Sequence, residues 1–142
     1  MIVTVTEDNF KQEAFEWLKP RAYLQEFKDD FSYVAFCEDG KILGVLLFSD
    51  YDGNNIFVHL AIDDPRCCQR RYIKLMFDYA FNQAKVNRMT ALCVNGYKRN
   101  ERLLAGVGFV KEGVVRKFFR QEEKFVDAAL YGILREECKY GK

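Results

Sequence analysis

The 142-residue sequence lacks the features that mark membrane proteins, secreted proteins and zinc-binding modules. No apolar run approaches the roughly 20 residues that a membrane-spanning helix needs. The N-terminus, MIVTVTEDNF, has neither the basic start nor the apolar stretch of a signal peptide. No Cys-x-x-Cys pair occurs, so a zinc knuckle is not expected, and no metal site is predicted.

The cysteines favour reduced thiols in a cytoplasmic protein. Their number is odd and their spacing is irregular, and two of them are adjacent and poorly placed to bond to each other. The five are Cys37, Cys67, Cys68, Cys93 and Cys138.

Charge of neither sign dominates, since the net charge is +1. The balance predicts no general attraction to nucleic acid or to a membrane surface. A local basic set leaves an RNA-binding module as one interpretation, but no recognisable RNA motif accompanies it, so nucleic acid is not expected as a partner. The basic residues are Arg66, Arg70, Arg71, Lys98 and Arg99. With 49% apolar residues and no repeat or linker, residues 1–142 are predicted to form a single domain.

Alternating apolar residues and turn signals predict an α/β (α+β) fold with a mixed, mostly antiparallel, twisted sheet of about seven strands. The Glu38-Asp39-Gly40-Lys41 stretch indicates a hairpin, because Asp-Gly suits positive φ. The expected strands are 2–5, 31–37, 42–49, 55–62, 89–95, 109–119 and 125–135.

Helical spacing predicts about four helices between these strands. The first follows Thr6, and Pro20 either ends it or starts the next. Ala22, Leu24 and Phe27 indicate a second short helix there. The longest covers about 65–85, and the last covers 98–105. A strand–helix–strand unit over 55–95 should join parallel strands by a right-handed crossover.

The stretch DDPRCCQRRYIK, residues 63–74, predicts a helix that begins with an anion site. Asp64 is a suitable N-cap and Pro65 fits the first helical position. The first amides of a helix have no partner within it, and arginine side chains suit phosphate. The alternative is a solvated basic helix face capped by Asp64, and the pattern alone leaves both open.

Four segments resemble the GNAT superfamily of N-acetyltransferases, and in style the ribosomal-protein N-terminal alanine acetyltransferase branch. They are DYAF at 78–81, NRMTALCV at 87–94, RLLAGVGFVKEGVVR at 102–116 and DAALYGILREEC at 127–138. The resemblance covers roughly residues 55–138, and it implies a single-domain GNAT-like fold with acetyl-CoA as co-substrate.

The resemblance also assigns the cofactor site. It implies that a splayed strand binds the pantetheine arm and that the start of the long helix binds the pyrophosphate, with an asparagine from the next loop nearby. On this sequence the strand residues are Leu60, Ala61 and Ile62, the helix-start residues are Arg66, Cys67, Cys68, Gln69, Arg70 and Arg71, and the asparagines are Asn95 and Asn100.

The chain departs from the family pattern in the loop before the long helix, after the fifth strand, where the usual Asn and Ser or Ala fall at Tyr97 and Asn100, and at the general acid. The usual loop glycine falls at Cys67 and the following small residue at Gln69, so no glycine eases the approach of the pyrophosphate. The tyrosine that serves as general acid in many relatives falls at Leu104, which makes Tyr97 the nearest replacement.

The implied reaction is direct attack of an amine on the acetyl thioester, aided by a backbone N–H of residues 60–62. His59, the only histidine, is a candidate general base, although it could equally be a packing residue on the other face of its strand. A helix N-terminus beside arginines lowers a thiol pKa, yet a covalent role for Cys67 or Cys68 is disfavoured.

Three questions stay open in the sequence. The acceptor is a protein N-terminus or a small amine. A catalytically silent GNAT-like domain that acts by binding CoA or a protein is the alternative to an enzyme. The closing strands leave room for a homodimer, because edge strands can pair with a second copy.

Overall fold

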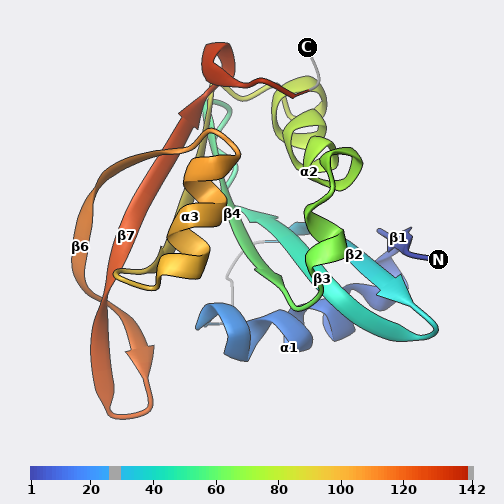
Figure 1. Cartoon of the computed structure of the whole chain (residues 1–142), viewed down its shortest axis with the longest axis horizontal. Helices are drawn as coiled ribbons and strands as arrows, with labels where there is room; N and C mark the ends of the chain where they lie inside the picture. Colours follow the sequence, from blue (N-terminus) through green and yellow to red (C-terminus); the bar gives the residue numbers. More distant parts are fainter. Residues whose placement is uncertain (26–29, 141–142) are drawn as a thin grey trace.

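A single seven-stranded sheet forms the centre of the protein in the computed structural model, which describes residues 1–25 and 30–140 (Figure 1). The strand order is β1-β2-β3-β4-β5-β7-β6. The strands are β1 (Val3–Val5), β2 (Ser32–Glu38), β3 (Lys41–Ser49), β4 (Asn55–Ile62), β5 (Arg88–Val94), β6 (Val110–Gln121) and β7 (Lys124–Leu134). The α-helices are α1 (Lys11–Ala22), α2 (Arg70–Phe77) and α3 (Lys98–Gly106).

Neighbouring strands are antiparallel except for β4 and β5, which are parallel. The segment that contains α2 joins these two strands, as the sequence predicted for a crossover unit. The mixed, mostly antiparallel sheet and the expected strand positions are therefore confirmed.

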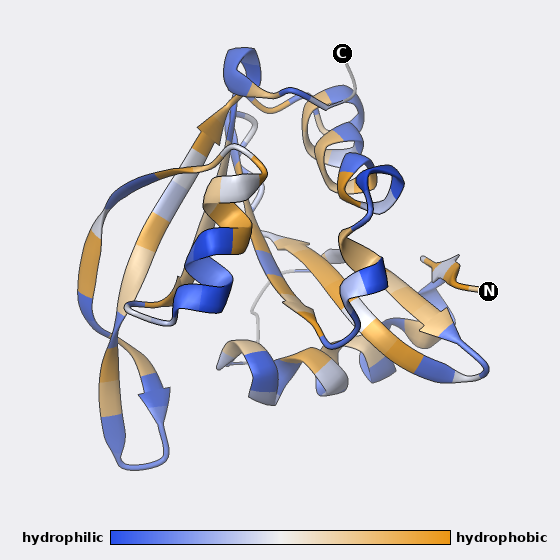
Figure 2. Ribbon diagram, viewed as in Figure 1, coloured by the Kyte–Doolittle hydropathy of each residue, from blue (hydrophilic) through white to orange (hydrophobic). Residues whose placement is uncertain are grey.

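The helices cover opposite faces of the sheet and bury two separate cores. On one face Met76 and Phe77 of α2 and Leu104 of α3 pack against the central strands. On the other face Phe15 and Leu18 of α1 form a smaller cluster with β2 and β3. Figure 2 shows that the central strands are mostly apolar, whereas the first turn of α3 is hydrophilic. Each strand between the helices thus has two apolar sides.

The β6–β7 hairpin extends beyond the rest of the sheet, and its turn lies away from α2 and α3 (Figure 1). The pairing register shifts between Val115 and Phe119. Lys117 in this irregular part has φ 52°, and its amide donates to the Asp127 carboxylate at 2.9 Å. This bond holds the bend where the hairpin leaves the sheet.

The helices differ from the prediction in two places. Pro20 lies inside the last turn of α1, which ends with Tyr23 in the left-handed conformation (φ 54°, ψ 41°). Residues 23–25 are not helical, so the described chain has no separate short helix after Pro20, and Phe27 lies outside the described residues.

The expected helix over 65–85 is three consecutive pieces. Pro65–Cys68 forms a 3₁₀ turn, α2 follows, and Asp78–Gln83 continues as a π-helix. The extended backbone of Gln69 (ψ 148°) separates the first piece from the second. The apolar spacing did not reveal this break, because both sides of it bury side chains against the same core.

Candidate functional site

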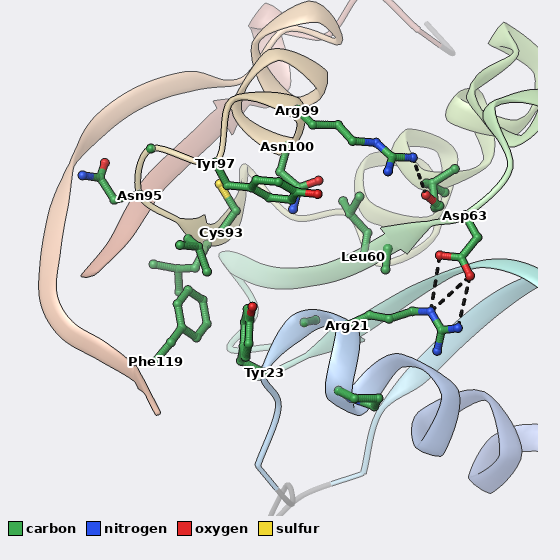
Figure 3. A pocket seen from close by; sticks show the side chains of 17 residues that line it. Arg21, Tyr23, Leu60, Asp63, Cys93, Asn95, Tyr97, Arg99, Asn100 and Phe119 are labelled. Atoms are coloured by element: carbon green, nitrogen blue, oxygen red, sulfur yellow. Dashed lines mark hydrogen bonds and ion pairs between the residues drawn. The ribbon is translucent and has the colours of Figure 1, made fainter. Parts of the chain in front are cut away.

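The parallel strands β4 and β5 separate along their length and leave a cavity between them (Figure 3). Their pairing ends at Val58 and Ala91. Beyond that point β4 stays paired to β3 as far as Ile62, and β5 stays paired to β7 as far as Val94. The cavity has a volume of about 550 Å³, within the usual range for small-molecule sites.

The β4 edge of this cavity is an open backbone. The Ile62 carbonyl faces it and accepts a bond from Arg99 Nη2 at 2.9 Å. The next amide, Asp63 N–H, donates in the opposite direction to Leu43 O at 2.8 Å. Because backbone groups alternate sides along a strand, the N–H and C=O groups of Leu60 and Ile62 both point into the cavity.

The loop from β5 to α3 forms the opposite wall. Asn95, Tyr97, Arg99 and Asn100 all line the cavity, and Tyr97 reaches into it from the position just before α3 (Figure 3). The Tyr97 side chain is half exposed. This wall therefore offers a phenol, two amides and one guanidinium.

Glu101 fixes the shape of this loop. Its carboxylate accepts bonds from Gly96 N–H at 2.6 Å and from the Tyr131 hydroxyl at 2.7 Å, and it pairs with Lys111 at 2.9 Å. Lys111 is the main cause of a lowered Glu101 pKa, while burial and then the Glu101 carboxylate raise the pKa of Tyr131 to about 12. The network ties the start of α3 to β6 and β7.

The third wall comes from the end of α1. Arg21 binds Asp63 with an Nη2–Oδ2 distance of 3.1 Å, and its guanidinium lies 3.8 Å from the centre of the Trp17 ring. Tyr23 also lines the cavity and contacts Phe119 of β6, with ring centroids 5.8 Å apart. This wall combines aromatic rings with a closed ion pair.

The structure divides the predicted cofactor residues into two groups. Leu60, Ala61, Ile62, Asn95 and Asn100 line the cavity. The helix-start residues do not line it. They are Arg66, Cys67, Cys68, Gln69, Arg70 and Arg71.

The guanidinium of Arg66 already has carboxylate partners. It donates to Glu38 at 2.6 and 3.0 Å and to Asp64 at 2.9 Å. Hydrogen bonds from Arg66 and from the N-terminal ammonium hold the pKa of Glu38 at about 2. The Arg66 guanidinium is therefore already paired in this structure, because Glu38 approaches it from a distant hairpin, and its role as a phosphate ligand stays a prediction.

The other two predicted arginines lie against aromatic rings. The Arg70 guanidinium lies 4.7 Å from the centre of the Tyr140 ring, and that of Arg71 lies 4.8 Å from the Tyr72 ring. Both arginines remain exposed, whereas Tyr72 is buried.

The two neighbouring thiols are less acidic than a free cysteine. Burial raises the pKa of Cys67 to about 11, and burial also raises the pKa of Cys68 despite the nearby Arg99. The expected lowering of a thiol pKa is wrong here, because desolvation outweighs the positive surroundings. This agrees with the view that neither cysteine is a nucleophile.

The loop before α2 does not need the glycines that it lacks. None of residues 63–75 has positive φ. The Cys67 side chain is fully buried beneath the sheet, near Gly44, so it does not project from the loop. Gln69 has extended backbone at the N-cap of α2. The departures at Cys67 and Gln69 therefore leave the loop backbone unstrained.

His59 lies apart from the cavity lining. Its Nε2 is 2.9 Å from the hydroxyl of Ser49, which also donates to Asp50 at 2.8 Å. Burial lowers the pKa of His59 to about 4. His59 pairs with Leu47, whose side chain belongs to the α1 face. This placement favours the packing interpretation, and the general-base role stays a prediction without a contact in the cavity to support it.

Several cavity residues were not among the predicted site residues. Arg21, Tyr23, Asp63, Cys93 and Phe119 all line it. Cys93 is buried, and burial raises its pKa to about 11. No local pattern connects the end of α1 with β6, so only the assembled sheet shows that these side chains meet.

Comparisons with known proteins agree with this architecture. No family model matches the sequence. The chain is 25% identical over 127 residues to the uncharacterized, SPbeta prophage-derived N-acetyltransferase YokL of Bacillus subtilis (strain 168). The aligned part covers 86% of this chain and 70% of that protein.

The fold is that of known acetyltransferases. Spermidine N-acetyltransferase from Vibrio cholerae, solved in complex with CoA and spermine, superposes with a TM-score of 0.75 at 11% identity, over 96% of each chain. Mutant forms of SpeG, the spermidine/spermine N-acetyltransferase of the same organism, give a TM-score of 0.77 at 11% identity, over 95% of this chain and 94% of that one. The expected GNAT-like fold is confirmed, whereas the narrower likeness to the alanine acetyltransferase branch stays a prediction.

Within residues 1–25 and 30–140, no helix is long and apolar enough to cross a membrane. The same residues contain no cluster of three or more histidine, cysteine or acidic side chains suited to a metal ion.

The partly buried His59 makes stability depend on pH. Its pKa is about 4 in the folded protein and near 6.5 when exposed, so between these values the unfolded chain binds more protons. Stability from the neutral ring is complete above pH 6.5 and is lost as the pH falls toward 4, by about 3 kcal/mol in all. We expect His59→Gln to flatten this part of the pH dependence in urea unfolding. Parallel curves for the two proteins would contradict the burial of a neutral ring.

Proposed function

We propose that the protein is an acetyl-CoA-dependent N-acetyltransferase that acetylates a primary amine by direct attack in a ternary complex. The observation that carries the proposal is the separation of β4 from β5, which opens a cavity through the sheet beside unpaired strand backbone. The fold it shares with acetyltransferases and the 25% identity to an N-acetyltransferase support the same conclusion.

The residues around the cavity suit the chemistry of acetyl-CoA. Its pantetheine arm carries amide groups, and the Leu60 N–H and C=O and the Ile62 N–H on the open edge of β4 are matching partners, whereas the Ile62 C=O already accepts from Arg99. Its phosphates need positive charge, which Arg99 supplies at the cavity. The backbone amides of Arg70 and Arg71, the first two residues of α2, offer further donors on the same face of the sheet. Asn95 and Asn100 add side-chain amides.

The chain's own groups would assist the transfer in two ways. Acetyl-CoA supplies an activated acetyl thioester. Attack of the neutral amine would form a C–N bond as the C–S bond breaks, the amine would release one proton to solvent, and CoA would leave as the thiol. Leu60 and Ile62 N–H groups are available to stabilise negative charge on the carbonyl oxygen. The Tyr97 hydroxyl, which lines the cavity, is the candidate donor of a proton to the departing sulfur.

A catalytically silent domain that only binds CoA is the second candidate. Leu104, at the position of the usual general acid, is buried in the core and cannot take that role. Binding alone would not separate the two candidates, whereas release of free CoA thiol in the presence of an amine would.

Binding is tested by melting temperature. Saturation at about 100 times the dissociation constant should stabilise the protein by about 2.7 kcal/mol with acetyl-CoA or CoA, but ATP should have little effect because it lacks the pantetheine arm.

We expect Arg99→Ala to weaken acetyl-CoA binding by about tenfold, as expected for loss of a charge-assisted contact. Arg102→Ala is the control, because Arg102 is exposed on the same helix and does not line the cavity. Equal loss in both variants would point to general electrostatics instead.

Turnover is tested with Tyr97→Phe. The variant keeps the ring and loses the hydroxyl, so acetyl-CoA should bind as before while kcat falls by at least about tenfold. Unchanged kcat would remove Tyr97 from the mechanism. Absence of thiol release by the unaltered protein, with acetyl-CoA bound, would favour the silent domain.

The cellular location and the oligomeric state both stay predictions. Cytoplasmic location rests on the sequence alone. Self-association stays a proposal supported by the hairpin, where Phe118 and Phe125 are 50% and 56% exposed.

A further inference from the structure

The cavity has two unlike ends, because it passes from one face of the sheet to the other. The face with α2 and α3 carries Arg99 and the start of α2. The opposite face carries the end of α1, with Arg21 and Tyr23. If the proposed function holds and phosphates occupy the first end, the acceptor amine must enter from the α1 end.

Aromatic side chains form the wall at the α1 end. Tyr23 and Phe119 are in ring contact, and Gln121 Nε2 donates to the Tyr23 hydroxyl at 3.4 Å. Tyr23 reaches this position from a left-handed backbone that bulky residues rarely adopt. Figure 3 shows Tyr23 and Phe119 on the same side of the cavity, below Tyr97. The residue that follows α1 and a residue of β6 thus close one apolar wall.

The charges at the cavity do not favour a ligand with several positive charges. The charged residues among the described lining are Arg21, Asp63 and Arg99. Asp63 is the one carboxylate among them, and Arg21 already binds it through both Nε (3.3 Å) and Nη2 (3.1 Å). Arg21 is held in turn by the Trp17 carbonyl at 2.6 Å. The net charge of the three charged lining residues is therefore positive.

We infer that the acceptor is a small primary amine with one positive charge on an apolar, preferably aromatic, body. The body would pack against Tyr23 and Phe119, and the amine would point toward the open edge of β4. A polyamine would bring further ammonium groups to a lining with two guanidiniums and one neutralised carboxylate, where their desolvation is uncompensated. The inference rests on the proposed acetyltransferase function and refines its acceptor.

The test compares three amines at fixed acetyl-CoA by release of CoA thiol. Phenethylamine has one charge and a ring, ethylamine has one charge without a ring, and spermidine has several charges without a ring. We expect kcat/KM for phenethylamine to exceed that for each of the other two by at least about tenfold, as burial of one aromatic ring predicts. A peptide with a free N-terminal alanine is included as a fourth acceptor.

Two variants test whether the rings of Tyr23 and Phe119 cause the expected preference for phenethylamine. Tyr23→Asn removes the ring but keeps a residue that tolerates the left-handed backbone, and Phe119→Leu keeps an apolar side chain without the ring. Each should reduce the ratio of phenethylamine to ethylamine kcat/KM by about three- to tenfold. Phe125→Leu is the matched control, because Phe125 lies on the same hairpin, is 56% exposed and does not line the cavity. It should leave the ratio unchanged.

The outcomes separate the two proposals. Acetylation of spermidine, ethylamine or the peptide as efficiently as phenethylamine would overturn the inference and leave the acetyltransferase function standing. A phenethylamine preference that survives both Tyr23→Asn and Phe119→Leu would also overturn it. No thiol release with any amine, although acetyl-CoA raises the melting temperature, would overturn both.

Discussion

The separation of β4 from β5 is the constraint on which the site depends. Each strand is held by its outer neighbour beyond Val58 and Ala91, where they stop pairing with each other. The twist of a sheet moves adjacent strands apart unless hydrogen bonds join them, so two well-anchored strands can diverge without loss of order. The result is an opening along which backbone groups of β4 have no strand partner.

The surroundings of the opening make it asymmetric. Glu101 anchors the loop before α3 through Gly96, Lys111 and Tyr131, which positions Arg99 and Tyr97. The α1 end has a closed ion pair and aromatic rings instead. The proposed anionic cofactor on one face and the proposed singly charged apolar amine on the other both rest on this difference.

Local sequence signals were sufficient for most of the fold. Alternation and the Asp39-Gly40 turn predicted the central strands, and resemblance predicted that residues 60–62 would be the open strand edge. Interactions between distant segments were not predictable in the same way. Glu38 forms an ion pair with the Arg66 guanidinium. Burial raises the pKa of Cys67, whereas the sequence pattern predicted a lowered thiol pKa.

The wall proposed for the acceptor, made by Tyr23 and Phe119, could not be predicted from local sequence either, because its two residues lie far apart in the chain. Tyr23 follows a helix that includes a proline, and Phe119 lies beyond an irregular part of β6. Neither residue carries a motif, and each alone resembles an ordinary core aromatic. Their meaning comes from the register of the sheet and the left-handed end of α1, which bring them to one cavity.

The most direct measurement is a titration of the ¹⁵N-labelled protein with CoA, followed through the amide resonances of β4. If the open strand edge binds the pantetheine arm, the Leu60 and Ile62 amides should shift strongly, because they gain hydrogen-bond partners. The Ala61 amide, which points toward β3, should move much less. Saturable CoA binding that leaves Leu60 and Ile62 unshifted would contradict the account, because the cofactor would then lie outside the separation of β4 and β5.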